Sequence, residues 1–124
     1  MTTIVDPVVS SFVHSLSLET RLQVSNKIKE LYPDCVPVLV GKGETKTTPS
    51  TPKNKIVVSA DARFGSFAHG IRKSIPGIDS HTAIIFFVNG VVICPSSTLQ
   101  ELYDKYKSAD GFLYVTYTCE NTFG

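Results

Sequence analysis

Apolar residues recur along this chain with two different spacings, and each spacing indicates a type of secondary structure. Spacings of three and four residues, typical of helices, occur in residues 17–32, 64–75 and 98–106. Short runs rich in β-branched and aromatic residues, typical of strands, occur at residues 36–40, 55–59, 83–88 and 112–118. The run at 83–88 is continuous enough to predict a strand buried on both faces.

Residues with special backbone preferences predict where these segments end. Ser17 is placed to cap a helix with a broad apolar stripe, and Pro33 stops that helix because proline cannot donate a backbone hydrogen bond. Thr98-Leu-Gln-Glu101 has the pattern of a capping box. Asn89-Gly90 supplies two positive-φ residues for a tight turn. Residues 41–54 lack periodicity and predict a loop.

A further apolar segment precedes these elements. Asp6-Pro7 is typical of a helix start, and residues 8–16 after it are apolar on more than one side. The predicted order is helix, helix, strand, strand, helix, strand, short helix and strand. Two strands, a helix and two more strands is the order of a β-grasp domain, although ferredoxin-like and other α+β folds give similar orders.

The composition is that of an ordinary globular domain of 124 residues, 42% hydrophobic and 19% charged. Twelve basic residues offset eleven acidic ones, which argues against a nucleic-acid partner. Three cysteines without a Cys-x-x-Cys pair and three scattered histidines predict a reducing compartment, no metal site and no cofactor. There is no signal peptide pattern, and the apolar runs are shorter than the roughly 20 residues of a membrane span, so we expect any membrane attachment to be added later.

No group of residues has the arrangement of a catalytic site. Residues 40–47 lack the glycine spacing of a phosphate-binding loop. Cys35 and Cys119 have no histidine nearby in the sequence, and the aspartates fall in different predicted elements: Asp61, Asp79 and Asp104. We therefore expect a protein that is not an enzyme.

Several longer motifs point to one known family. They are Tyr32-Pro-Asp-Cys-Val-Pro-Val-Leu-Val40, Phe64-Gly-Ser-Phe67 with Ile71-Arg-Lys73, Ile85-Phe-Phe-Val-Asn89, Leu102-Tyr103, and Asp110-Gly-Phe-Leu-Tyr-Val-Thr-Tyr117 with Glu120-Asn-Thr-Phe-Gly124. In these motifs the chain resembles the autophagy ubiquitin-like modifiers of the GABARAP and light-chain-three type, called autophagy-related protein eight in yeast. The resemblance runs in register from about Leu18 to Gly124, with a one-residue insertion near residues 76–78.

The resemblance implies an α+β fold, a ubiquitin-like β-grasp with a four-stranded mixed sheet and two additional N-terminal helices. Residues 1–17 would be a variable N-terminal helix region, and residues 18–124 the ubiquitin-like domain with a C-terminal tail at 119–124. Gly124 would be activated by E1-like and E2-like conjugation enzymes and joined to phosphatidylethanolamine. The protein would thus move from the cytoplasm to the autophagosome membrane, and a deconjugating cysteine protease would be a further partner.

The resemblance also implies an adaptor that binds aromatic-x-x-aliphatic motifs of cargo receptors along the edge strand at residues 55–59. An edge strand apolar on both faces is prone to association unless a partner strand covers it. The aromatic pocket implied by the family consists of Ile28, Pro37, Leu39, Lys55, Val57 and Phe112. The aliphatic pocket consists of Ile56, Val58, Ala62, Phe67 and Ile71. For Ile28, Leu39, Phe67 and Ile71, a purely structural place in the core fits the sequence equally well.

The chain departs from the family pattern at several positions. Cys35 and Ser74 replace basic residues, Val24 replaces a glutamate and Ser59 replaces a proline. Charge-assisted contacts contribute about 1.5–3 kcal/mol each where they are buried, so the lost basic residues predict weaker or redirected peptide binding. The apolar residues 8–16 replace a basic first helix, which leaves open whether they pack on the domain or touch a membrane.

Three functions therefore remain open at the level of sequence. The first is a lipid-conjugated autophagy modifier and adaptor. The second is a modifier joined to a protein lysine, although that branch typically ends in Trp-Gly, whereas this chain ends in Phe123-Gly124. The third is a peptide-binding module that is never conjugated.

Overall fold

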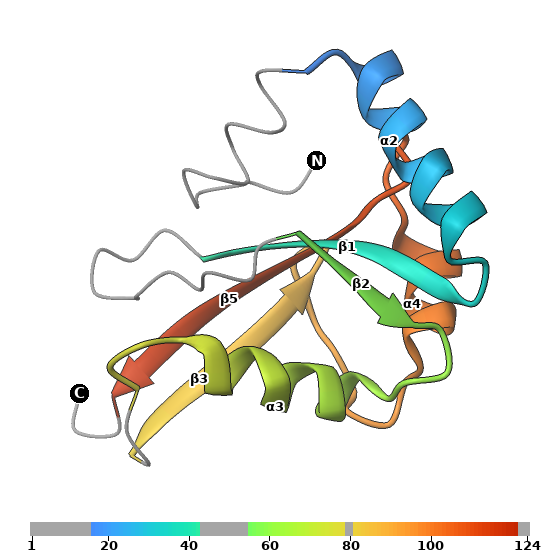
Figure 1. The fold of residues 1–124 in the computed structure, drawn as a ribbon. Helices are drawn as coiled ribbons and strands as arrows, with labels where there is room; N and C mark the ends of the chain where they lie inside the picture. Colours follow the sequence, from blue (N-terminus) through green and yellow to red (C-terminus); the bar gives the residue numbers. More distant parts are fainter. Residues whose placement is uncertain (1–15, 43–54, 79–80, 122–124) are drawn as a thin grey trace.

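The structure, a computed structural model, describes residues 16–42, 55–78 and 81–121 of the chain. These residues form an α+β fold with one mixed sheet, and α2 and α3 lie on opposite faces of it (Figure 1). The helices and strands are α2 (Leu18–Leu31), β1 (Cys35–Lys42), β2 (Lys55–Ser59), α3 (Phe64–Ser74), β3 (Thr82–Val88), β4 (Val91–Val92), α4 (Leu99–Tyr106) and β5 (Leu113–Asn121).

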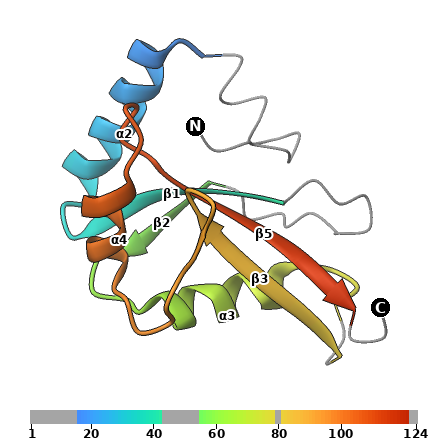
Figure 2. The same ribbon diagram turned by 180° about the vertical axis from the view of Figure 1, so that it is seen from behind.

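The sheet has five strands in the order β2-β1-β5-β3-β4. The central pair, β1 and β5, is parallel, and the other pairs are antiparallel. Figure 2 shows β5 between β1 and β3, so the first and last strands of the domain meet in the middle of the sheet. Of the two strands that precede α3, β2 forms one edge of the sheet and β1 lies next to it.

The prediction of four strands was wrong because β4 adds a fifth. It has two residues and follows a turn in which Asn89 and Gly90 have φ values of 56° and 76°, as the Asn-Gly pair predicts. A strand this short cannot show an alternating pattern in the sequence. The last strand also continues to Asn121, three residues beyond its expected end at Thr118.

The main core lies between the sheet and α3, with α4 closing one end. Alternate residues of β1 and β5 enter it, as the period of two in a strand requires, and Phe64 of α3 packs edge-on against Phe86 of β3 with ring centroids 5.8 Å apart. The side chains that β1 and β5 contribute are Val36, Val38, Val40, Leu113, Val115 and Tyr117.

Burial in α2 is lower than its apolar stripe suggests, and the prediction that β3 is buried on both faces was wrong. The apolar stripe of α2 is largely outside the core: Leu18 is 49% exposed and Leu31 62% exposed, and Ser25 is the buried residue of the helix. Strand β3 is not buried on both faces, since only Phe86 and Val88 are buried and Ala83 is exposed. The helical spacing predicted α2 correctly, but it did not show that polar contacts hold α2 to the sheet.

Several predictions concern residues outside the described ranges. These are the first helix at residues 8–15, most of the loop at 41–54, and Gly124. The structure therefore describes one N-terminal helix, α2, where two were predicted. Within the described ranges, no helix has the length and apolar character needed to cross a bilayer.

Candidate functional site

Strand β2 lies at the edge of the sheet and pairs with β1 on one side. Its register places Val57 opposite Pro37 and Val58 opposite Val36. Val36 lies in the core beneath α3, whereas Pro37 lies on the other face of β1, toward α2. The β2 edge therefore separates two groups of apolar residues, one on each face of the sheet.

On the α2 face, the structure brings together three of the six residues predicted for the aromatic pocket. Leu39 and Phe112 are buried in a cluster with Tyr114, and Ile28 of α2 packs against them together with Val24. Pro37 is buried, and Val57 remains 38% exposed beside it. Lys55 is in register with Leu39, so its backbone belongs to the same stretch of the edge.

On the α3 face, the residues predicted for the aliphatic pocket lie at the border of the main core. Val58 and Ala62 are half-buried and pack against the cluster that contains Phe67 and Ile71. Ile56 is in register with Val38 on β1. Phe67 and Ile71 are themselves core residues, so each has a structural role whatever the edge binds.

Helix α2 is attached to the rest of the protein by a polar cluster around Asp110. Arg21 donates from Nη1 to Asp110 Oδ2 at 2.9 Å, and Tyr114 donates its hydroxyl proton to the same oxygen. Ser25 donates to the main-chain oxygen of Asp110 at 2.6 Å. Asp110 is fully buried, and its second carboxylate oxygen accepts from the backbone N–H of Phe112 at 3.0 Å.

Burial and the hydrogen bond to Asp110 raise the pKa of Tyr114 well above its usual range, so this hydroxyl stays protonated as a donor. The pKa of Tyr103 is also raised, chiefly by burial, and its hydroxyl donates to the Gly111 carbonyl at 2.7 Å. The sequence identified Asp110 and Gly111 only as the first residues of a family motif. The buried carboxylate was missed because its partners lie 89 and 85 residues away in sequence.

The turn beside this cluster depends on a glycine. Gly111 has a φ of +83°, and a Cβ added there would overlap Ser25 Oγ. Positive φ is costly for residues other than glycine, so both backbone conformation and space select glycine here. Ser25 is small for the same reason, because the helix approaches the turn closely at this point.

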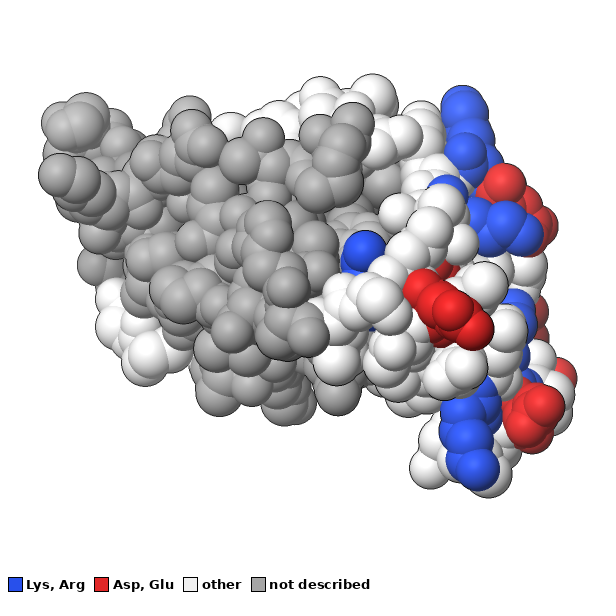
Figure 3. All heavy atoms as spheres, turned by 90° about the horizontal axis from the view of Figure 1, so that it is seen from above, with Lys and Arg blue, Asp and Glu red and all other residues white. Residues whose placement is uncertain are grey.

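The outer surface around α2 carries charges of both signs. Figure 3 shows Lys and Arg interspersed with Asp and Glu over the described part of this face. Two of the lysines, Lys29 and Lys107, lie over the ring of Tyr103, with Nζ 4.5 and 5.5 Å from its centroid. The described part of this face therefore has no large patch of purely positive or purely negative charge.

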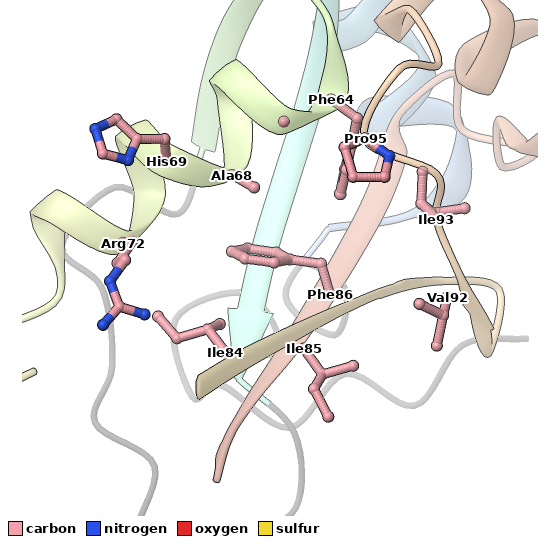
Figure 4. Close-up of a pocket in the computed structure, with 11 residues that line it drawn as sticks. Phe64, Ala68, His69, Arg72, Ile84, Ile85, Phe86, Val92, Ile93 and Pro95 are labelled. Atoms are coloured by element: carbon pink, nitrogen blue, oxygen red, sulfur yellow. The ribbon is translucent and has the colours of Figure 1, made fainter. Parts of the chain in front are cut away.

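A cavity of about 410 Å³ lies between α3 and the strands β3 and β4. Figure 4 shows apolar side chains from α3 and β3 on its walls, with Arg72 and His69 on the α3 side. None of the residues predicted for the two pockets lines it. One sequence signal relates to this cavity: the apolar run that includes Ile84, Ile85 and Phe86, which we interpreted as a buried strand.

The described residues contain no assembled chemical site. No group of three or more His, Cys, Asp or Glu side chains within them is arranged to hold a metal ion. All three cysteines are thiols, and a hydrogen bond with the Ser96 side chain lowers the pKa of the exposed Cys94.

Comparison with known proteins agrees with this geometry. The family model "Autophagy protein Atg8 ubiquitin like" matches residues 20–124. The chain is 39% identical over 116 residues to autophagy-related protein 8 of Dictyostelium discoideum, covering 94% of this chain and 95% of that one. It is 40% identical over 115 residues to autophagy-related protein 8a of Arabidopsis thaliana, covering 93% of each.

Solved structures agree as well. The crystal structure of Trypanosoma brucei ATG8 matches with a TM-score of 0.81 and 30% identity, covering 91% of this chain and 97% of that one. Plasmodium falciparum Atg8, solved in complex with a Plasmodium falciparum Atg3 peptide, matches with a TM-score of 0.77 and 29% identity, covering 86% of this chain and 94% of that one. The chain therefore belongs to the Atg8 family of ubiquitin-like autophagy modifiers, whose members are not enzymes.

Proposed function

We propose that this protein is joined through the Gly124 carboxylate to the amine of phosphatidylethanolamine, and that it then binds aromatic-x-x-aliphatic peptides along β2. The observation that carries the second part is the β2 edge, with the Leu39–Phe112–Tyr114 cluster on one face and the main core on the other. Family membership supports the first part.

The chemistry of a terminal glycine suits conjugation. E1-like and E2-like enzymes would carry the Gly124 carbonyl as a thioester, and the lipid amine would displace the thiol to form an amide. Glycine has no side chain to obstruct either transfer. The lipid supplies membrane affinity of about 0.8 kcal/mol per buried CH₂, so two acyl chains anchor a cytoplasmic protein firmly to the autophagosome membrane.

The β2 edge suits a peptide that adds a strand to the sheet. Main-chain hydrogen bonds to an open edge provide affinity, and alternate side chains of the added strand point to opposite faces. The aromatic residue would enter the α2 face near Val57, Pro37 and Phe112, and the aliphatic residue the α3 face near Val58 and Ala62. The Atg3 peptide bound by the Plasmodium relative supports an E2-like enzyme as one peptide partner, beside cargo receptors.

A crossed pair of variants tests the two parts separately. Gly124→Ala is expected to bind motif peptides like the unmodified protein but to gain no lipid when incubated with the E1-like and E2-like enzymes and phosphatidylethanolamine liposomes. Val57→Asp is expected to bind an aromatic-x-x-aliphatic peptide at least tenfold more weakly, because a carboxylate is costly to desolvate. It keeps the attachment point, so it should still be lipidated when the E2-like enzyme is present at a saturating concentration. Mass spectrometry and calorimetry give the two readouts.

The matched control for the edge is Val92→Asp, since Val92 is an exposed valine (64%) of β4 at the opposite edge. It should leave both readouts unchanged. Attachment to protein lysines in place of lipid would support the alternative modifier. Peptide binding without any conjugation would support the unconjugated module, and lipidation of Gly124→Ala would contradict the proposed attachment point.

A further inference from the structure

We propose that Asp110 is the positioning residue of the aromatic pocket, because its carboxylate and carbonyl hold the two sides of that pocket at a set distance. This inference rests on the proposed function, since it concerns how the α2 face of the β2 edge accepts an aromatic side chain. It assigns a role to a buried carboxylate that neither conjugation nor the edge strand requires.

The sheet side of the pocket is held through Phe112. Its backbone N–H donates to Asp110 Oδ1 at 3.0 Å, and its ring is fully buried against Leu39 and Tyr114. Tyr114 donates its hydroxyl to Asp110 Oδ2. One carboxylate therefore orients two of the three buried members of the cluster.

The helix side of the pocket is held through Arg21 and Ser25. Arg21 pairs with Asp110 Oδ2, and Ser25 binds the Asp110 carbonyl. Ile28, the predicted pocket residue on α2, lies less than one turn beyond Ser25 and packs on the same cluster. Asp110 thus contacts both of the elements between which an inserted aromatic ring would lie.

Apolar contacts contribute little to the position of α2. Only Val24 and Ile28 of this helix pack on the cluster, and both are half-buried, whereas Leu18 and Leu31 are exposed. Leu39 and Phe112 are covered in this structure, so an incoming ring needs α2 to sit at a particular distance from the sheet. Within the described residues, the polar cluster ties α2 to the turn at Asp110, because a buried charge must keep its partners.

The test uses two peptides that differ only at the aromatic position, one with Trp and one with Ala, and measures both dissociation constants by calorimetry. Asp110→Asn keeps the shape of the side chain but removes the charge that pairs with Arg21. It is expected to weaken binding of the Trp peptide about tenfold, the size of one lost charge-assisted hydrogen bond, while the Ala peptide changes by less than about twofold.

Tyr114→Phe provides a milder second variant, since it keeps the ring and removes only the hydroxyl bonded to Asp110. It should show the same preference for loss at the aromatic position but a smaller one, about threefold, because the Asp110 carboxylate keeps Arg21 and the Phe112 N–H as partners. Thr98→Ala is the matched control: it removes the N-cap of α4 and so lowers stability away from this pocket, and the ratio of the two peptide affinities should not change.

Each result of this test either supports or contradicts the positioning role of Asp110. A reduced Trp-to-Ala affinity ratio in both Asp110→Asn and Tyr114→Phe supports the inference. If Asp110→Asn does not fold, the ratio in Tyr114→Phe decides alone. An unchanged ratio in folded variants overturns the positioning role and leaves the proposed function intact. A wild-type protein that binds neither peptide contradicts the proposed function, and the inference with it.

Discussion

At the scale of single residues, a buried charge and a glycine with positive φ lie next to each other where α2, α4 and β5 meet. Asp110 has a buried carboxylate with three partners, and its carbonyl accepts a hydrogen bond from Ser25. Gly111 beside it has a positive φ, and a Cβ added there would overlap Ser25. Buried charges and restricted backbone positions are the kinds of site at which one substitution has a large effect. Two predictions belong to this junction.

Replacing Gly111 by alanine should destabilise the protein by more than about 2 kcal/mol. The left-handed conformation costs roughly 1 kcal/mol for a residue with a Cβ, and the overlap with Ser25 adds to it by pushing α2 away from the turn. Gly90→Ala is the control, since Gly90 has a φ of +76° but no atom within 4 Å of the added Cβ. Urea unfolding measures both, and equal losses would contradict the close-approach argument.

The raised pKa of Tyr114 predicts that the folded protein becomes less stable as the pH rises into the alkaline range. Above about pH 10 the unfolded chain loses the Tyr114 proton while the folded protein keeps it, so the unfolded state binds fewer protons and stability falls as pH rises. The limiting slope is about 1.4 kcal/mol per pH unit. Urea unfolding of the wild type and Tyr114→Phe from pH 8 to 11 should show a shallower decline in the variant. Parallel curves would contradict the assignment.

At the scale of elements, the helices differ in how they are held. Three residues of α3 and three of α4 are buried, whereas α2 buries only Ser25. The caps predicted from sequence are present on both α2 and α4: Ser17 accepts from the Thr20 N–H, and Thr98 forms a full capping box with Glu101. A cap should matter more where the helix it starts is part of the core.

Removing the caps tests this difference. Thr98→Ala is expected to lower the free energy of unfolding by about 1–2 kcal/mol, because α4 carries Leu99, Leu102 and Tyr103 into the core. Ser17→Ala should cost about 0.5 kcal/mol, since Leu18 and Glu19 at the start of α2 are exposed and can fray while Arg21 keeps its contact with Asp110. Denaturant unfolding of the two variants gives the comparison, and a larger loss for Ser17→Ala would contradict it.

At the scale of the whole molecule, strand order separates the two proposed activities. The parallel pairing of β1 with β5 places β2 at one edge of the sheet and leads β5 toward the C-terminal residues. The peptide edge thus belongs to a different strand from β5, the strand that precedes Gly124 in the sequence. At a saturating concentration of the E2-like enzyme, the crossed variants Gly124→Ala and Val57→Asp should therefore act independently. Effects of either variant on both activities under that condition would indicate that the two activities are coupled.

The positions of the helices and strands follow from the sequence because their signals are local. Each signal acts within a few residues: the hydrophobic spacing, the caps Ser17 and Thr98, and the turn at Asn89-Gly90. The first and last residues of β2 were predicted without error. The grouping of Ile28, Leu39 and Phe112 also appears in the structure, although their role in peptide binding stays a prediction. Family motifs, not spacing, supplied that grouping.

The features that local patterns did not show depend on residues far apart in the chain. They are the buried Arg21–Asp110–Tyr114 cluster, the exposed stripe of α2, the two-residue strand β4 and the cavity beside α3. The sequence by itself determined which segments form helices and strands and which family they build. Only the tertiary structure decided which side chains are buried together, because burial and charge pairing arise from contacts that no short stretch of sequence contains.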